Sequence, residues 1–236
     1  MPREMRLTPE LVARVPPHDG ISGLVSSISN RPTDADYADW AAFLLKDRPA
    51  SGDVWVFAYG SLIWNPEFAF IEERHGIVRG WHRSFCLGWV RIYRGTPERP
   101  GIMLAMDRGG SCRGVAFRLP QDEIEANLIP LLRRELPFKL EKSEMPARWV
   151  TAQTAEGDVR AIAFPISRAS PAYLPGLTED QVVEALATAA GERGSMAEYL
   201  HSTVAHLEQR GIHDRYLWRL QALVAERIAA RYGGAG

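Results

Sequence analysis

The hydrophobic positions of this chain are crowded in its middle and helically spaced towards its end. Between residues 53 and 166, short apolar runs rich in β-branched and aromatic residues are separated by turns that contain glycine, which is typical of strands. From about residue 178 onward, apolar residues recur at intervals of three and four, which predicts amphipathic helices. The pattern therefore predicts an α+β protein.

The densest apolar run is Val54-Trp55-Val56-Phe57-Ala58, which predicts a buried strand. A second strand-like segment extends from Gly76 to Val90. Residues 102–106 and 113–119 flank Asp107-Arg108-Gly109-Gly110, and this arrangement predicts a hairpin with its turn at the two glycines.

A second predicted hairpin joins residues 149–152 to residues 159–164 through Glu156-Gly157-Asp158. Between the two hairpins, residues 122–134 have the pattern of an isolated helix. Short strands with glycine-bearing turns predict a small mixed β-barrel or a strongly curled sheet, surrounded by helices.

The last third of the chain predicts three helices. Thr178 and Gln181 form a capping box for a helix that extends to Ala190, where Gly191 is expected to stop it. The next helix is expected to end at Gly211, and Asp214 is expected to cap the last one. Their apolar faces consist of Met196, Leu200, Val204 and Leu207, and of Leu217, Leu220, Val224 and Ile228. The glycine-rich tail 233–236 is expected to be disordered.

Residues 1–52 predict a helical N-terminal extension that precedes a domain of residues 53–232. Thr8 can cap a short helix that runs to Val15 and is ended by two prolines. A capping box begins at Thr33, and the helix after it places Tyr37, Trp40, Phe43 and Leu44 on one face. This face is expected to pack on the main domain; binding of a partner protein is the alternative.

Composition excludes several classes of protein. The net charge of -1 over 236 residues gives no electrostatic reason to expect nucleic acid or an anionic membrane as a partner. No apolar run is long enough to span a membrane and the N-terminus lacks an apolar signal core, so a cytoplasmic location is expected. Cys86 and Cys112 are expected to be buried free thiols, and no His or Cys spacing indicates a metal site, so no metal or other cofactor is expected.

The turn Tyr59-Gly60-Ser61 is the first candidate for chemistry. It follows a buried strand, and Gly60 lets the backbone turn sharply or approach a ligand closely. Such a turn can present backbone N–H groups to an anion or an oxyanion. The alternative is an ordinary turn after a core strand.

Glu135 is the second candidate. Pro137 disfavours helix at Leu136, so the preceding helix should end close to Glu135. A carboxylate at that negative end of the helix dipole, buried beside leucines, should have a raised pKa and could act as a general base near neutral pH. The alternative is a surface glutamate paired with Arg133 or Arg134. Arg83, Arg91 and Arg94 are further candidates for a substrate carboxylate, although they are expected to be exposed strand residues.

Several segments together resemble a known family. They are Phe57 to Trp64, Gly80 to Cys86, Arg94 to Gly101, Gly109 to Cys112, Tyr199-Leu200 and Gly211 to Asp214. In this order, over about residues 53 to 225, they resemble the ChaC-like branch of the γ-glutamylcyclotransferase superfamily. That branch resembles enzymes that cleave glutathione to 5-oxoproline and Cys-Gly.

The resemblance implies roles for particular residues. It makes Glu135 the catalytic glutamate. Ser61 has no obvious His–Asp relay in the sequence, so we interpret it as a binding hydroxyl rather than a nucleophile. The resemblance assigns substrate binding to the loop and to Tyr199, whose hydroxyl would reach the substrate. The implied substrate-binding residues are Val56, Phe57, Ala58, Tyr59, Gly60, Ser61, Leu62 and Tyr199.

The resemblance also leaves alternatives open. Met145 stands where a tyrosine is expected before Pro146, and this segment borders the implied site, which puts substrate specificity in question. The implied small-molecule substrate is glutathione. Another γ-glutamyl amine or amino acid as substrate, and a non-catalytic regulatory protein on the same fold, are the alternatives.

Overall fold

The computed structural model describes residues 4–17 and 30–233. They form two compact units, which we describe separately. The barrel unit comprises residues 28–84 and 105–170, and the helical unit comprises residues 1–27, 85–104 and 171–236. The predicted boundary between residues 52 and 53 remains a prediction, and the units are defined by packing rather than by order along the chain.

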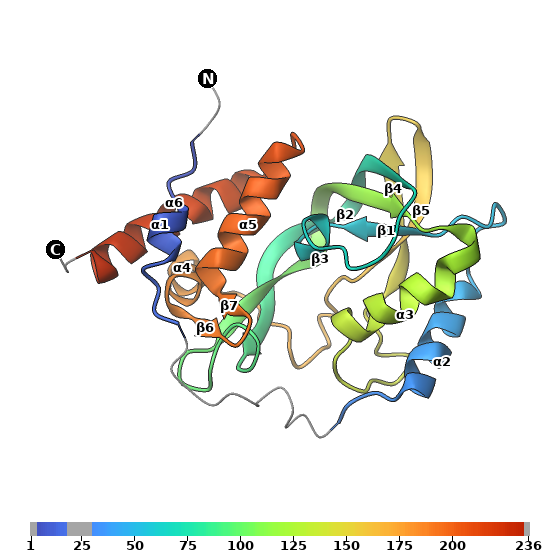
Figure 1. Cartoon of the computed structure of the whole chain (residues 1–236), viewed down its shortest axis with the longest axis horizontal. Helices are drawn as coiled ribbons and strands as arrows, with labels where there is room; N and C mark the ends of the chain where they lie inside the picture. The colour runs from blue at the N-terminus through green and yellow to red at the C-terminus, as the bar shows by residue number, and fades with distance from the viewer. Residues whose placement is uncertain (1–3, 18–29, 234–236) are drawn as a thin grey trace. The chain divides into compact units, whose positions relative to one another are not determined.

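The barrel unit is built on a closed barrel with the strand order β1-β3-β2-β4-β5 (Figure 1). The strands are β1 (Trp55–Ala58), β2 (Glu72–Val90), β3 (Gly101–Arg118), β4 (Arg148–Thr154) and β5 (Gly157–Ala163). The first strand is antiparallel to β3 and parallel to β5, which closes the barrel. The barrel with helices confirms the predicted α+β class.

Strand β1 lies in the core of the barrel unit. Val56, Phe57 and Ala58 have no exposed surface. Burial of one such large apolar side chain contributes roughly 1.5–3 kcal/mol. Gly114 of β3 lets the two strands meet closely, because a Cβ there would lie 2.3 Å from the Ala58 carbonyl oxygen. The end of β1, from which the candidate loop departs, is therefore held firmly.

The second predicted hairpin is confirmed, but the first is wrong. Strands β4 and β5 pair as an antiparallel hairpin in which Thr154 lies opposite Gly157, so its turn lies at residues 155 and 156. By contrast, β3 passes through the expected turn as one strand, with Gly109 and Gly110 at φ values of 106° and 67°. These glycines allow the bend of a long barrel strand instead of reversing the chain.

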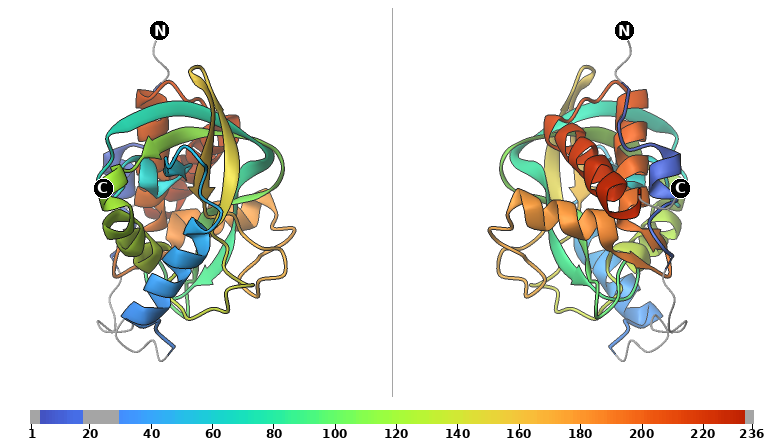
Figure 2. Two further views of the ribbon diagram at one scale, coloured as in Figure 1. Left: turned by 90° about the vertical axis from the view of Figure 1, so that its right-hand side faces the viewer. Right: turned by 90° about the vertical axis from the view of Figure 1, so that its left-hand side faces the viewer.

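Helices α2 (Asp34–Leu45) and α3 (Ile124–Glu135) lie side by side in the barrel unit, as Figures 1 and 2 both show. Thr33 and Asp36 form the predicted capping box of α2. Tyr37, Trp40 and Leu44 are buried as predicted, whereas Phe43 is 40% exposed. Phe43 was wrongly placed on the buried face, where the structure has Ala41. Helix α3 follows a short 3-10 turn, η2 (Gln121–Glu123).

The helical unit contains α1 (Pro9–Val12), α4 (Glu179–Thr188), α5 (Met196–Gln209) and α6 (Arg215–Tyr232). The eight apolar residues predicted to face inward on α5 and α6 are all buried, and Thr178 forms the predicted capping box. Two predicted helix ends are wrong: α1 ends before Val15, and α4 ends before Ala190. Gly191 is not a helix stop, because it pairs in a small sheet of β6 (Ala190–Gly191) and β7 (Gly194–Ser195).

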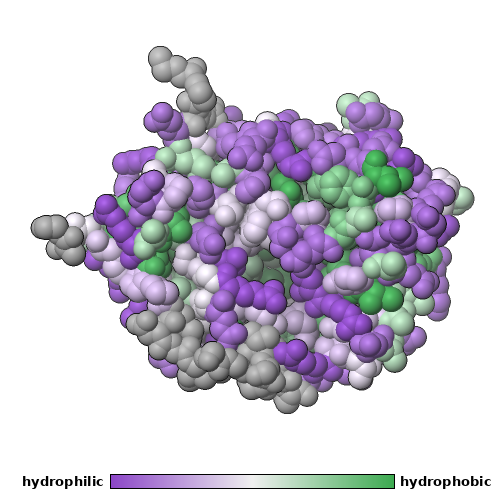
Figure 3. Space-filling model, viewed as in Figure 1, coloured by the Kyte–Doolittle hydropathy of each residue, from purple (hydrophilic) through white to green (hydrophobic). Residues whose placement is uncertain are grey.

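Two further predictions concern the cysteines and the termini. Cys86 and Cys112 are buried thiols that form no disulfide, as predicted. Residues 234–236 of the tail lie outside the described residues. No helix in the described part of the chain is long and apolar enough to cross a membrane. On the face shown in Figure 3, hydrophilic residues predominate and the hydrophobic areas are small.

Candidate active site

The candidate loop begins where β1 ends. The chain passes through Tyr59 and Gly60 into a single 3-10 turn, η1 (Ser61–Ile63). The Ile63 N–H donates to the Gly60 carbonyl at 2.9 Å. The N–H groups of Ser61 and Leu62 come first in this turn, so they have no acceptor within it. They are the donors that the loop can offer to a ligand.

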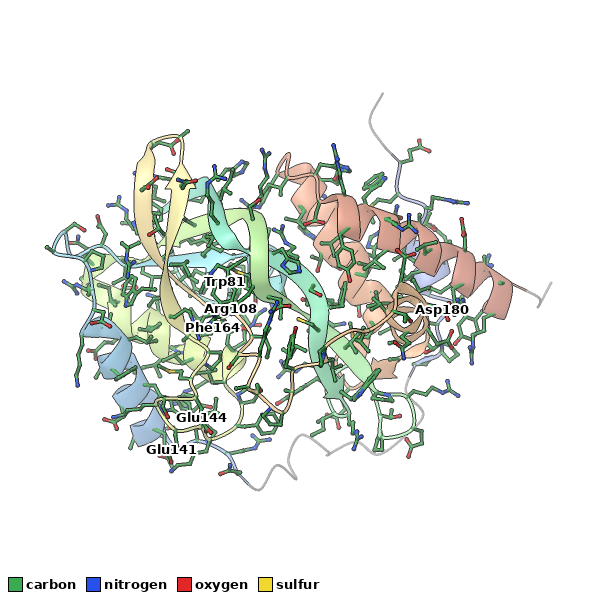
Figure 4. All side chains as sticks on the ribbon, turned by 180° about the vertical axis from the view of Figure 1, so that it is seen from behind. Trp81, Arg108, Glu141, Glu144, Phe164 and Asp180 are labelled. Atoms are coloured by element: carbon green, nitrogen blue, oxygen red, sulfur yellow. The ribbon has the colours of Figure 1, made fainter. Side chains whose placement is uncertain are left out.

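Tyr59 fixes the loop through both its side chain and its backbone. Its hydroxyl donates to the Phe164 carbonyl at 2.8 Å, and its own carbonyl accepts from Arg83 Nε at 2.6 Å. Arg83 also donates to the Arg113 carbonyl and is only 5% exposed. Figure 4 labels Phe164 near Trp81 and Arg108, whose guanidinium lies 5.9 Å from the Trp81 ring centre. The loop is thus fixed to the barrel by partly buried hydrogen bonds.

Glu135 is the last residue of α3, as predicted. Leu131 and Leu132 beside it are buried, and the N–H of Leu136 donates to the Leu132 carbonyl at 2.8 Å. The Glu135 side chain remains 24% exposed. The carboxylate is therefore largely withdrawn from water but retains an open side for a ligand.

Arg134 connects this carboxylate to the loop. Its Nη2 donates to Ser61 Oγ at 2.8 Å, and its Nε lies 3.2 Å from Glu135 Oε1. The same guanidinium donates to the Asn65 carbonyl and lies 3.5 Å from a carboxylate oxygen of Glu67. The side chain is 15% exposed. A planar guanidinium suits this task because its fork of donors can serve several acceptors at once.

The environment raises the pKa of the Glu135 carboxyl above its usual value. Burial is the main cause, the nearby Arg134 guanidinium opposes the rise, and the Glu67 carboxylate adds to it. The direction agrees with the prediction from the sequence. A carboxylate with a raised pKa is a stronger base, so it can accept a proton from an amine more readily.

The structure places the other predicted site residues in three places. Tyr59, Gly60, Ser61 and Leu62 lie on the loop that Arg134 joins to Glu135, whereas the side chains of Val56, Phe57 and Ala58 are enclosed in the core. Tyr199 lies on α5 in the helical unit, and its ring is 3% exposed. It packs edge-on against Phe85 with ring centres 6.4 Å apart.

Two arginines have other roles in the structure than the sequence predicts. Arg134 was considered only as a surface partner of Glu135, although its position next to that residue was a signal for a role in the site. Arg83 was expected to be exposed, but it is buried and bound to backbone carbonyls. Arg94 does not stand free either, because it binds the Ser195 carbonyl and lies 3.3 Å from Glu198 within the helical unit.

This arrangement can be compared with known proteins. The model of the ChaC-like protein family matches residues 54–227, which include the loop, Arg134 and Glu135. The chain belongs to the ChaC-like family. The matched segment begins after α2, so that helix lies outside it.

Relatives and solved structures agree with this assignment. A glutathione-specific γ-glutamylcyclotransferase of Escherichia coli is 36% identical over 192 residues, which is 81% of each chain. The mouse glutathione-specific γ-glutamylcyclotransferase 1 is 30% identical over 65% of this chain and 71% of its own. The crystal structure of a yeast γ-glutamyl cyclotransferase specific to glutathione has a TM-score of 0.64 at 20% identity, covering 74% of this chain and 96% of that one. The last comparison confirms the predicted fold.

Among residues 4–17 and 30–233, no cluster of three or more His, Cys, Asp or Glu side chains could hold a metal ion. The groups gathered around the loop include two carboxylates, those of Glu135 and Glu67, together with the Arg134 guanidinium, the Ser61 hydroxyl and backbone amides. Such a set is suited to binding a zwitterionic ligand and to moving a proton.

Proposed function

We propose that this chain is a γ-glutamylcyclotransferase that cleaves glutathione to 5-oxoproline and Cys-Gly. The observation that carries the proposal is the junction at Arg134, which places a carboxylate of raised pKa next to a loop with available N–H donors. The family to which the chain belongs and the names of its relatives support the same reaction and the same substrate.

The reaction needs little machinery because the nucleophile is part of the substrate. The α-amine of the γ-glutamyl group attacks the γ-carbonyl carbon of the same residue, and the amide C–N bond breaks as a five-membered lactam forms. Tethering of the two groups supplies a high effective molarity. The α-amine is mostly protonated at neutral pH, so a base must remove its proton.

Glu135 is the proposed base. It takes a proton from the α-ammonium group, which frees the amine to attack, and it passes that proton to the departing nitrogen. The second proton that the α-nitrogen loses as the lactam forms follows the same route, so Cys-Gly leaves as an ammonium and the carboxylate is regenerated in each turnover. Its exposed quarter is the side from which the amine would approach. Because its pKa is raised by burial, the carboxylate is better matched to an ammonium group than an exposed glutamate would be.

The loop is the proposed binding element. The N–H groups of Ser61 and Leu62 would stabilise the α-carboxylate or the negative charge that develops on the γ-carbonyl oxygen. Tyr59 and the buried residues Val56, Phe57 and Ala58 hold this loop in place. Gly60 leaves room for the ligand to approach the backbone, and Tyr199 is proposed to contact the substrate through its hydroxyl.

The decisive experiment is an assay of 5-oxoproline and Cys-Gly released from glutathione by the purified chain. We expect turnover by the wild type and a loss of about a hundredfold or more in kcat for Glu135→Gln, since general base catalysis typically supplies 10²–10⁴-fold. Glu156→Gln is the matched control, because Glu156 lies in the exposed turn between β4 and β5. Near-normal turnover by correctly folded Glu135→Gln would refute the mechanism.

A further inference from the structure

Helix α2 of the N-terminal extension contacts the end of α3 at residues before and after Glu135 in the sequence. Before Glu135, Arg133 Nη2 donates to Asp34 Oδ1 at 2.8 Å, and its guanidinium lies 4.8 Å from the centre of the Tyr37 ring. After Glu135, the Tyr37 hydroxyl donates to the Leu136 carbonyl at 3.1 Å. Tyr37 thus contacts the residues two before and one after the proposed base.

The Tyr37 side chain is held in place by burial and packing. Tyr37 is 5% exposed, and its ring packs edge-on against Trp40 with centres 5.4 Å apart. The far end of α2 is held as well, since Trp149 Nε1 of β4 donates to the Leu44 carbonyl at 2.8 Å. Because α2 is fixed at both ends, it can restrain the backbone at Leu136.

The segment after Glu135 is also tied to α2. Lys139 Nζ lies 3.1 Å from Asp36, and Lys142 Nζ lies 2.7 Å from Asp39. These two ion pairs follow the chain as it returns along the helix, where Figure 4 labels Glu141 and Glu144 close to α2. The pairs are exposed and individually weak, so the buried bond from Tyr37 is the principal restraint.

We infer that α2 is a positioning element for catalysis and that Tyr37 is its positioning residue. This inference rests on the proposed function. Tyr37 touches no reacting atom; it fixes the backbone that leaves Glu135, and with it the direction of the carboxylate towards the loop. An extension outside the segment that the family model matches thereby becomes part of the catalytic apparatus.

The charged groups near the carboxylate are Arg134 on α3 and Glu67 on the loop, and neither is altered by substitution of Tyr37. A loosened α3 end would admit water to Glu135 and so weaken the main cause of its raised pKa. The acid limb of the pH profile, where kcat falls as Glu135 becomes protonated, should then move to lower pH. A tyrosine that served stability alone would leave that limb in place.

The test compares Tyr37→Phe and Asp34→Asn with the wild type, using glutathione as substrate. We expect Tyr37→Phe to lower kcat about tenfold with KM little changed, because small misplacements can cost up to a hundredfold, and we expect the acid limb to shift downward. Asp34→Asn should act in the same direction more weakly. Hydrogen exchange of the amides of residues 136–145 should be faster in both variants.

Two matched controls accompany these variants. Tyr232→Phe removes a buried hydroxyl for which the described residues offer no partner, and Asp180→Asn removes a first-turn aspartate that pairs with Arg227 in the helical unit. Both should retain wild-type kcat. If Tyr37→Phe keeps the wild-type kcat and acid limb, α2 is not a positioning element, whatever the exchange data show. If the wild type is inert towards every γ-glutamyl compound, the proposed function fails first, and this inference fails with it.

Discussion

Arg134 Nη2 donates a 2.8 Å hydrogen bond to Ser61 Oγ and so joins the end of α3 to the loop after β1. The two residues are 73 positions apart in the chain. The same guanidinium lies 3.2 Å from Glu135, so one side chain contacts both the proposed base and the proposed binding loop. This connection makes Arg134 as important to test as Glu135.

We expect Arg134→Met to lower kcat/KM at least tenfold, because hydrogen bonds to charged groups contribute about 1.5–3 kcal/mol and 1.4 kcal/mol is tenfold. The guanidinium opposes the rise in the pKa of Glu135, so without it the acid limb of kcat/KM should move to higher pH. Arg134→Lys keeps the charge but loses the fork, so it should shift the limb less while still losing activity. A pH–rate profile of the three proteins measures both effects, with Arg231→Met as the control. If the acid limb lies at the same pH in the wild type and in Arg134→Met, Arg134 does not influence the pKa of Glu135.

Glu135 should cost stability at neutral pH. Its pKa is raised in the folded state, so folding favours the protonated carboxyl. The stability that the protonated carboxyl contributes is fully present below the unfolded pKa of about 4.5, and it is lost as pH rises through the folded pKa. Glu135→Gln should therefore melt at a higher temperature than the wild type at pH 7, with the difference shrinking towards pH 4.5. Thermal unfolding of both proteins over this range is the measurement. A variant that melts below the wild type at pH 7 would mean that the pair with Arg134 outweighs burial.

Much of the fold was predictable because it depends on local signals. Residues close together in the sequence determine the capping boxes at Thr33 and Thr178. The same is true of the 3.6-residue periodicity of α5 and α6. The two glycines at 109 and 110 misled the prediction, since glycine serves a turn and a bent barrel strand equally well. Only the pairing of β3 with distant strands decides between these alternatives.

The site was predictable only in part for the same reason. The position of Glu135 at a helix end follows from Pro137 two residues later. By contrast, the bonds of Arg83 to Tyr59 and of Tyr37 to Leu136 join residues 24 and 99 positions apart. No local pattern distinguishes such a buried donor from an ordinary surface arginine or core tyrosine.

Gly60 offers a test of the loop. Its φ is -139°, so this glycine does not lie in the left-handed region, and close approach of a ligand to the backbone is the role that we test. A methyl group there would hinder a ligand that approaches the backbone closely. We expect Gly60→Ala to weaken binding of 5-oxoproline about tenfold with little change in melting temperature. Calorimetric titration gives the affinity; a large loss of stability with intact affinity would instead indicate an ordinary turn.

The last prediction concerns the choice among γ-glutamyl compounds. The α-amine and α-carboxylate are common to all of them, so contacts to these groups cannot select glutathione. Selection must come from residues that meet the Cys-Gly half, and we place these in residues 136–145, which follow the proposed base directly. Met145 in this segment is 6% exposed, so its side chain shapes the segment from within rather than meeting the ligand.

Phe138 is the exposed large apolar side chain of that segment, at 45% exposure, and it lies three residues after Glu135. We expect Phe138→Ala to lower kcat/KM for glutathione several-fold and to leave the low kcat/KM for γ-Glu-Ala unchanged, since binding energy from a remote part of the substrate is expressed in kcat/KM. Phe43→Ala, which truncates a comparably exposed phenylalanine on α2, is the control. The measurement is kcat/KM for glutathione, γ-Glu-Ala and γ-Glu-ε-Lys with all three proteins. If either of the last two substrates matches glutathione with the wild type, the assignment to glutathione is wrong, although the cyclotransferase reaction would stand.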